Sequence, residues 1–252
     1  MSRITQRGAT GPLALVANGA FQTTTDTNLQ TLTGSRWDLS DGREVALVFN
    51  SAAGAIAAGL LVQGPAFLVN HQDLVTVAYV PYSNNGNVPA KVTVTLGNTL
   101  VTANQYTGGF VIVNSGTGIG QTLKIASHPA ANALANLVLT LEEGATVALV
   151  AGNSKVCLSA PQHVNVVVHP TASTGAAVGV TLYALPVSSF GFVVTRGQTA
   201  CLNDAGTTVG YPLMRSSNTA GAVMTAANTG DFVGNSSQAG VTTESRMITV
   251  NL

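Results

Sequence analysis

Two segments in which apolar and other residues alternate lie on either side of a glycine-rich loop near the middle of this chain. Residues Gly109 to Asn114 carry valine at every second position, and Gln121 to Ala126 carry Leu123 and Ile125 in the same rhythm. A period of two matches a pleated strand and not a helix. The loop between them, Ser115 to Gly120, holds three glycines, which accept the positive φ angles of tight turns. The segment therefore predicts a β-hairpin.

Strand-like runs of similar length recur at intervals of about 8 to 12 residues, which is typical of a sandwich or barrel. We therefore predict an all-β fold of many short antiparallel strands. A hairpin is expected around a type I′ turn at Asp41-Gly42. Further strands are expected in KVTVTL and TLVTA around Gly97-Asn98, and in LVLTL and TVALV around residues 142–144. Only residues 51–63, with Ser51 as a candidate N-cap, suggest one short α-helix.

Changes in composition along the chain suggest three parts. Residues 1–33 are rich in Thr, Asn, Gln and Gly and suit either an extended arm laid over a neighbour or a disordered tail. Residues 34–187 are expected to form the main β domain. Residues 188–252 have shorter runs and more frequent glycines, which predicts a smaller C-terminal β module that begins near Ser188.

Only 8% of the 252 residues are charged, with ten basic and ten acidic side chains. A soluble globular domain carries about 25%. A surface with so few charges and no net charge favours association, so we expect a homo-oligomer, with a trimer favoured. Binding to nucleic acid depends on clustered Lys and Arg, and the lysines here are scattered, so no nucleic-acid partner is expected.

Two cysteines, Cys157 and Cys201, are too few for a disulfide framework and are expected to be buried thiols. The apolar run Leu13 to Ala17 is shorter than the core of a signal peptide, which predicts synthesis in the cytoplasm without export. No segment has the 18 to 20 uninterrupted apolar residues of a membrane helix. No membrane association is therefore expected.

The sequence offers no pattern for a nucleotide or a metal ion. The glycine loop reads GxGxG and leads into a strand, whereas a dinucleotide fingerprint opens a helix. Zinc motifs of the CxxC, HExxH or HxH kind are absent. No cofactor is therefore expected. The four histidines are interpreted as turn or surface residues: His71, His128, His163 and His169.

No catalytic residues are predicted. No serine stands in GxSxG. Asp38, Asp41 and Glu44 cluster around the first predicted turn, but a glycosidase pair would need a cleft with aromatic platforms, and aromatic residues make up only 5% of the chain. This cluster is interpreted as a solvated turn. Glu142 and Glu143 are interpreted in the same way, with a calcium-ligand role left open.

Several segments resemble one known family. They are TANQYTGGFVIVNSGTGIGQTLKIASHPAA, LTLEEG, SKVCL, NVVVHPT, the DGRE hairpin and FGFVVTRGQTACL with the glycine and turn patterns that follow it. Together they span most of residues 35–252 and look like tailed-bacteriophage structural proteins encoded among the head genes. The resemblance implies a non-enzymatic virion component on the capsid surface, a decoration or cement protein whose partner is the major capsid protein. No catalytic residues come with that family.

Candidate contact residues for such a partner are apolar: Leu13, Phe21, Trp37, Phe190 and Phe192. Trp37, the only tryptophan, is expected to anchor either a core or an interface. Two other classes of protein stay open. A fibre, tail or receptor-binding module, or a carbohydrate-binding one, would share the β content. A depolymerising enzyme would need paired carboxylates in a groove.

Overall fold

The computed structural model describes residues 4–6, 16–17, 20–21, 23, 25, 29, 32–50, 54–85, 87–204, 206–226 and 231–252. The chain divides into two compact units. Residues Ala66–Pro161 form one unit, which we call the inserted barrel, because the other unit is built from the chain on both sides of it, Met1–Pro65 and Gln162–Leu252. We call this second one the larger unit.

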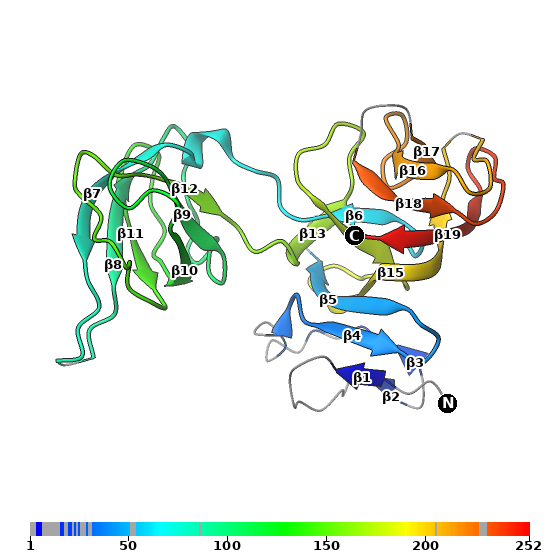
Figure 1. The fold of residues 1–252 in the computed structure, drawn as a ribbon, viewed down its shortest axis with the longest axis horizontal. Coiled ribbons are helices and arrows are strands. Elements are labelled where there is room, and N and C mark those ends of the chain that lie inside the picture. Colours follow the sequence, from blue (N-terminus) through cyan, green and yellow to red (C-terminus); the bar gives the residue numbers. More distant parts are fainter. Residues whose placement is uncertain are drawn as a thin grey trace. The chain divides into compact units, whose positions relative to one another are not determined.

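The inserted barrel is a closed ring of six antiparallel strands in the order β10-β11-β8-β7-β12-β9 (Figure 1). The strands are β7 (Leu74–Val80), β8 (Lys91–Thr95), β9 (Phe110–Ser115), β10 (Thr122–Ser127), β11 (Asn136–Leu141) and β12 (Lys155–Ser159). A 3-10 turn, η2 (Val69–His71), precedes β7. Closing the ring leaves no free strand edge, which is one way in which β proteins avoid uncontrolled pairing.

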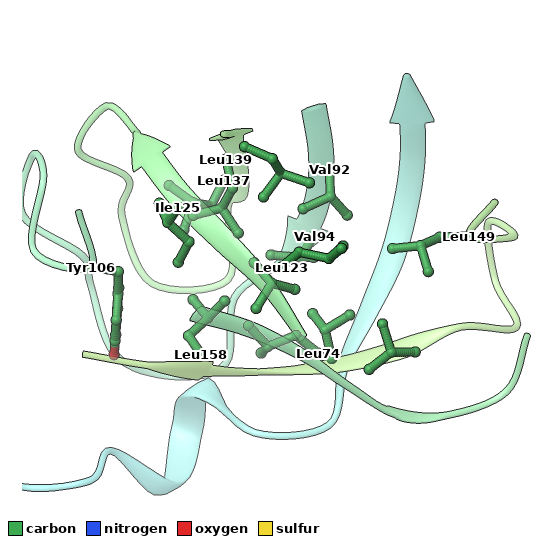
Figure 2. Packing of buried hydrophobic residues seen from close by; sticks show 14 of the residues in the cluster. Leu74, Val92, Val94, Tyr106, Leu123, Ile125, Leu137, Leu139, Leu149 and Leu158 are labelled. Carbon is green, nitrogen blue, oxygen red and sulfur yellow. The ribbon is translucent and has the colours of Figure 1, made fainter. Parts of the chain in front are cut away.

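The core of the barrel comes from every second residue of its strands. Figure 2 shows Val92 and Val94 of β8, Leu123 and Ile125 of β10, and Leu137 and Leu139 of β11 meeting inside the ring. The predicted hairpin is confirmed, because Leu123 pairs with Val111 in the antiparallel register of β9 and β10. Successive residues of the alternating segments therefore face the inside and the outside of the barrel in turn.

The larger unit contains a sheet of eleven strands, whose order is β1-β4-β5-β13-β6-β14-β15-β19-β18-β16-β17. They are β1 (Ile4–Gln6), β4 (Arg36–Leu39), β5 (Glu44–Asn50), β6 (Leu61–Gln63), β13 (Val164–Val168), β14 (Ala177–Thr181), β15 (Phe190–Leu202), β16 (Pro212–Arg215), β17 (Val223–Thr225), β18 (Phe232–Ser236) and β19 (Ser245–Asn251). A separate pair joins β2 (Val16–Ala17) to β3 (Ala20–Phe21). All pairings in the eleven-stranded sheet are antiparallel except that of β5 with β13.

An additional pairing of β5 with β15 closes a ring of five strands, β5-β13-β6-β14-β15, within this sheet. Each strand of the ring contributes to one cluster, with Val48, Val62, Val166, Val178 and Val193 among its members. The opposite faces of β5 and β15 pack into a second cluster around Trp37. Because β5 is covered on both faces, its apolar run is nearly continuous rather than alternating.

The all-β prediction is confirmed, and the one short helix expected over residues 51–63 is wrong. Residues 51–53 lie outside the described part. Beyond them Ile56 forms an isolated bridge with Leu185, Gly59 has φ +73°, and Leu61–Gln63 is strand β6. All three residues of β6 are buried, because Val62 packs into the cluster shared by the five strands of the ring and Leu61 packs into a different cluster. Such a strand gives a short continuous apolar run, which periodicity cannot distinguish from a buried helix.

The units also differ from the three parts predicted from composition. Residues 188–252 are not a separate module, because the first half of β15 pairs with β5 and the second half with β19. The predicted arm contributes β1, which pairs with β4 of the same chain, while most of residues 1–31 lie outside the described part. The residues on either side of the insertion lie next to each other. Gly64 stands just before it and Gln162 just after it, and a Cβ built on Gly64 would lie 2.7 Å from the carbonyl oxygen of Gln162.

Three smaller predictions are also corrected. Only Gly42 of the Asp41-Gly42 pair has a positive φ, and Leu39 N–H bonds to Arg43 C=O, so the turn has three residues and is not type I′. Residues 99–103, the predicted strand TLVTA, form only an isolated bridge, between Val101 and Ala131. Residues 146–150 form no strand. Strand β8 pairs with β7 and β11 instead, so the ring is already complete without these segments.

Candidate interaction surface

The histidines were predicted to lie in turns or at the surface. His163 lies in a turn and His71 in the 3-10 turn η2, but none of the four is exposed. His71, His128 and His169 are buried, and His163 is half-buried. Among the described residues, no group of three or more His, Cys, Asp or Glu side chains is placed to hold a metal ion. No helix in the described part of the chain is long and apolar enough to cross a membrane.

In the barrel, two histidines flank one tyrosine. The Tyr106 hydroxyl donates to His71 Nδ1 over 2.5 Å, and His71 Nε2 donates to the carbonyl of Thr99 over 3.1 Å. His128 Nε2 accepts the N–H of Tyr106, and its Nδ1 donates to Pro129 C=O. Burial raises the pKa of Tyr106 to about 12 and lowers the pKa of His128. Tyr106 is therefore uncharged at pH 7, and the three side chains connect the loops at one end of the barrel.

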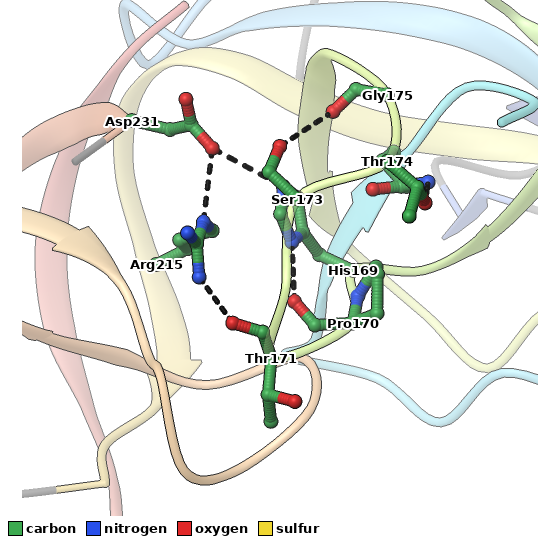
Figure 3. A network of polar contacts seen from close by, with 9 residues as sticks. His169, Pro170, Thr171, Ser173, Thr174, Gly175, Arg215 and Asp231 are labelled. Carbon is green, nitrogen blue, oxygen red and sulfur yellow. Dashed lines mark hydrogen bonds and ion pairs between the residues drawn. The ribbon is translucent and has the colours of Figure 1, made fainter. Parts of the chain in front are cut away.

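His169 of the larger unit repeats the bond made by His128, with Nδ1 donating to Pro170 C=O over 2.9 Å. Its Nε2 lies 3.8 Å from Asp231, which is too far for a hydrogen bond. Asp231 instead accepts from Arg215 Nε over 3.0 Å, and Arg215 also donates to the carbonyl of Thr171 (Figure 3). Burial lowers the pKa of His169. This network ties the segment after β13 to β16 and to the start of β18.

The acidic cluster of the first hairpin is only partly solvated. Asp41 forms a two-point contact with Arg43, which lowers the pKa of Asp41. Glu44, in contrast, is buried, pairs with Arg36 over 2.6 Å and accepts from the Thr195 hydroxyl. These carboxylates therefore hold the hairpin and β15 in place.

The glycine loop is filled by its own hydrogen bonds. Thr117 N–H donates to the Asn153 side chain, and the N–H groups of Ile119, Gly120 and Gln121 donate to carbonyls of the loop and of β9. A Cβ on Gly116 would lie 2.3 Å from the carbonyl oxygen of Asn153. Four amides that a phosphate cradle would use are thus already bonded. The loop is a tight turn packed against the loop before β12.

Both cysteines are free. Cys201 is completely buried, and burial raises its pKa to about 12. Cys157 is half-buried on the outer side of β12. The prediction of two buried thiols therefore holds fully for Cys201 and in part for Cys157. In the turn after β11, Glu142 is half exposed and pairs with Lys124 over 3.0 Å.

The predicted contact residues are mostly internal. Trp37, Phe190 and Phe192 are only 2–3% exposed. The rings of Trp37 and Phe192 meet edge to face with centroids 5.5 Å apart. These three side chains therefore form a core rather than a surface for a partner, because β4 and β15 both turn them onto β5. Phe21 lies in β3, and nothing is described of its side chain. Leu13 lies outside the described residues.

The exposed apolar side chains gather on the barrel. Of the 22 large apolar side chains that are exposed among the described residues, 15 belong to residues 66–161. Five residues on three neighbouring strands define what we call the outer apolar face: Val75 and Val77 of β7, Cys157 of β12, and Phe110 and Ile112 of β9. Cys157 lies directly opposite Ile112, and Val75 opposite Lys155.

The barrel is also poor in charge. Its 96 residues include only three lysines (Lys91, Lys124, Lys155) and three carboxylates (Asp73, Glu142, Glu143). Sequence reasoning detected the low charge of the whole chain but not the position of the exposed apolar residues. The signal was present in β9, where Phe110 and Ile112 alternate with the buried Val111 and Val113.

No family model, no curated protein and no solved structure matches this chain. The fold and the outer apolar face are therefore the basis for inferring its function.

Proposed function

We propose that this chain is a non-enzymatic structural protein of a tailed-bacteriophage virion. In this role it decorates the head, binds the lattice of the major capsid protein as a homo-oligomer, with a trimer favoured, and stabilises that lattice. The outer apolar face is the single observation that carries the proposal. A monomer exposing so many apolar side chains with so few charges would tend to associate. The family resemblance of the sequence indicates the partner.

The proposed mechanism is burial of apolar surface at many equivalent sites. Each subunit covers Phe110, Ile112 and their neighbours against the shell or against its own copies. Burial contributes about 25 cal/mol per Å2 of apolar area. Since few charges are involved, binding should depend weakly on salt. Repetition over a symmetric shell turns modest single contacts into a large total resistance to internal pressure.

The proposal is tested by locating the chain in purified virions with electron microscopy. Density that fits the six-stranded barrel on the outer surface of the head supports it. Density at the tail or fibres, or absence of the chain from the particle, contradicts it. A second test deletes residues 1–33 and measures occupancy on heads, because an arm that reaches a neighbour would lower occupancy when removed. Unchanged occupancy would exclude the arm from the mechanism.

A further inference from the structure

A second surface, on the larger unit, has a different chemistry. A pocket of about 340 Å3 opens where β15, β19 and β18 lie side by side. Its lining includes four exposed polar residues and one aromatic residue: Arg196, Asn235, Thr249, Asn251 and Phe232. Ligand pockets begin at about 300 Å3, so the volume suits a group of the size of one sugar ring.

Strand register brings the polar residues together. Arg196 of β15 lies opposite Asn251 of β19, and Asn235 of β18 lies opposite Thr249. Thr249 and Asn251 are two residues apart on one strand, so they share a face and are separated by about 7 Å. The sheet therefore presents two adjacent pairs of hydrogen-bonding side chains on one rigid surface.

Two positions in the lining of the pocket have room only for glycine. A Cβ on Gly234 would lie 1.9 Å from the carbonyl oxygen of Thr249, and a Cβ on Gly197, which has φ +99°, would lie 3.0 Å from Arg43 Cα. Both residues line the pocket. Its floor is therefore backbone, which any side chain at these positions would force to shift.

The charge of the pocket is unbalanced. Five arginines lie in the described part of the chain, and four of them pair with a carboxylate: Arg36 with Glu44, Arg43 with Asp41, Arg215 with Asp231 and Arg246 with Glu244. Among the described residues, Arg196 has no such partner, and no Asp or Glu lines the pocket. A guanidinium in a setting of neutral amides and a hydroxyl is complementary to a carboxylate, which it can bind through two parallel hydrogen bonds.

Phe232 adds an exposed aromatic ring to the polar side chains of the pocket. Its side chain is 49% exposed at the start of β18. An exposed aromatic ring offers a flat apolar surface, and the C–H face of a pyranose is flat and apolar as well. Asparagine side chains both donate and accept hydrogen bonds, and threonine does so through its hydroxyl. Such groups match the hydroxyls around a sugar ring.

We propose that this pocket binds an acidic saccharide, beyond the structural role proposed above. Arg196 pairs with the carboxylate of the sugar, Phe232 lies against the ring, and Asn235, Thr249 and Asn251 bind the ring hydroxyls. Because no carboxylate side chain lines the pocket in the described part of the chain, the site holds the sugar and provides no acid and base pair for cleavage. A virion protein with such a pocket would adhere to acidic surface polysaccharides.

Isothermal titration with the full chain tests this proposal, using trigalacturonate as the acidic probe and maltotriose as the neutral probe. Trigalacturonate is expected to bind at least about tenfold more tightly, because a charged two-point hydrogen bond contributes that much. Arg196→Gln should remove this preference. Phe232→Ala should weaken the binding of both sugars by about tenfold, while thermal unfolding of both variants stays unchanged because the side chains are exposed.

Two variants serve as matched controls. Tyr211→Ala removes another exposed aromatic ring of the larger unit, and Arg246→Gln removes an arginine that already has a partner. Both should bind trigalacturonate like the unaltered chain. The proposal is overturned if trigalacturonate fails to bind at roughly 5 mM, where millimolar affinities are measurable. It is also overturned if the two sugars bind equally, or if the preference survives in Arg196→Gln.

Discussion

The inserted barrel and the larger unit bury the apolar residues of their β-strands in different ways. The barrel closes six antiparallel strands around one core and leaves apolar side chains outside. The larger unit divides its apolar residues among three clusters and adds polar networks around Glu44 and His169 and around Asp204, which accepts hydrogen bonds from Ser216, Asn218 and Thr219. All three lysines lie in the barrel, and all seven arginines lie in the larger unit.

This difference suggests a division of roles. Arginines in the larger unit form ion pairs that fix segments distant in the sequence, as Arg215 does with Asp231. The barrel relies on its core for stability, so its exterior is free to be apolar and to meet a partner.

The largest expected effect concerns the core of the barrel. Leu139→Ala removes a fully buried side chain and should cost about 2–5 kcal/mol of unfolding free energy. In calorimetry only the transition of the barrel should move, because Leu139 packs in the barrel cluster alone. Leu134→Ala, at a position 68% exposed, is the control and should change little. Equal shifts of two transitions, or a single shared transition, would show that the units are not independent.

The next effect concerns association. The double variant Phe110→Ser, Ile112→Ser removes two half-exposed apolar side chains from the outer apolar face and should weaken self-association by about 1–2 kcal/mol, or roughly tenfold. Sedimentation velocity over a range of concentrations measures this. Leu134→Ser, which lies outside that face, is the matched control. An unchanged association constant in the double variant would remove this face from the interface.

A smaller effect is expected from pH. Burial lowers the folded-state pKa of His128, His163 and His169, whereas unfolded histidine titrates near 6.5. The unfolded chain therefore binds more protons, so stability is complete above about pH 7 and declines as the pH falls through 6.5. The larger unit has two of these residues and the barrel one. Calorimetry at pH 7.5 and 5.5 should show the greater loss in the larger unit, and His169→Gln should reduce it. A greater loss in the barrel would contradict this.

The smallest effect is expected at the surface of the barrel. Lys124 and Glu142 form an ion pair in which both side chains are nearly half exposed. Exposed pairs contribute about 0–1 kcal/mol, so Lys124→Ala should change the stability of the barrel by less than 1 kcal/mol. Urea unfolding at low and high salt measures this change. A larger cost would mean that the barrel depends on charge as the larger unit does.

Much of the fold could be predicted where one face of a strand is buried. The β9–β10 hairpin was predictable because Val111, Val113, Leu123 and Ile125 alternate with exposed residues. Strand β6 was not, because it is covered on both sides and loses this alternation. The insertion was also missed, since the separation of lysines from arginines involves only ten residues and long-range pairing defines the units.

Side-chain environments were the least predictable features. His71 is buried and hydrogen-bonded to Tyr106, 35 residues away along the chain. No local sequence pattern predicts such a partner. Trp37 was expected in either a core or an interface, and only the edge-to-face contact with Phe192 decides for the core. The saccharide pocket combines residues from three strands whose register is set by the fold. Exposed apolar residues on β9, in contrast, could be read from the sequence once the strand was recognised.

Binding to heads is tested by mixing the purified chain with purified heads of its proposed source, a tailed bacteriophage, after removal of any copies of the chain that they carry, and by measuring co-sedimentation. We predict saturable binding at a fixed number of copies per head, with affinity lowered about tenfold by Phe110→Ser, Ile112→Ser and unchanged by Leu134→Ser. A chain that stays in the supernatant as a stable single subunit at every concentration would contradict the account.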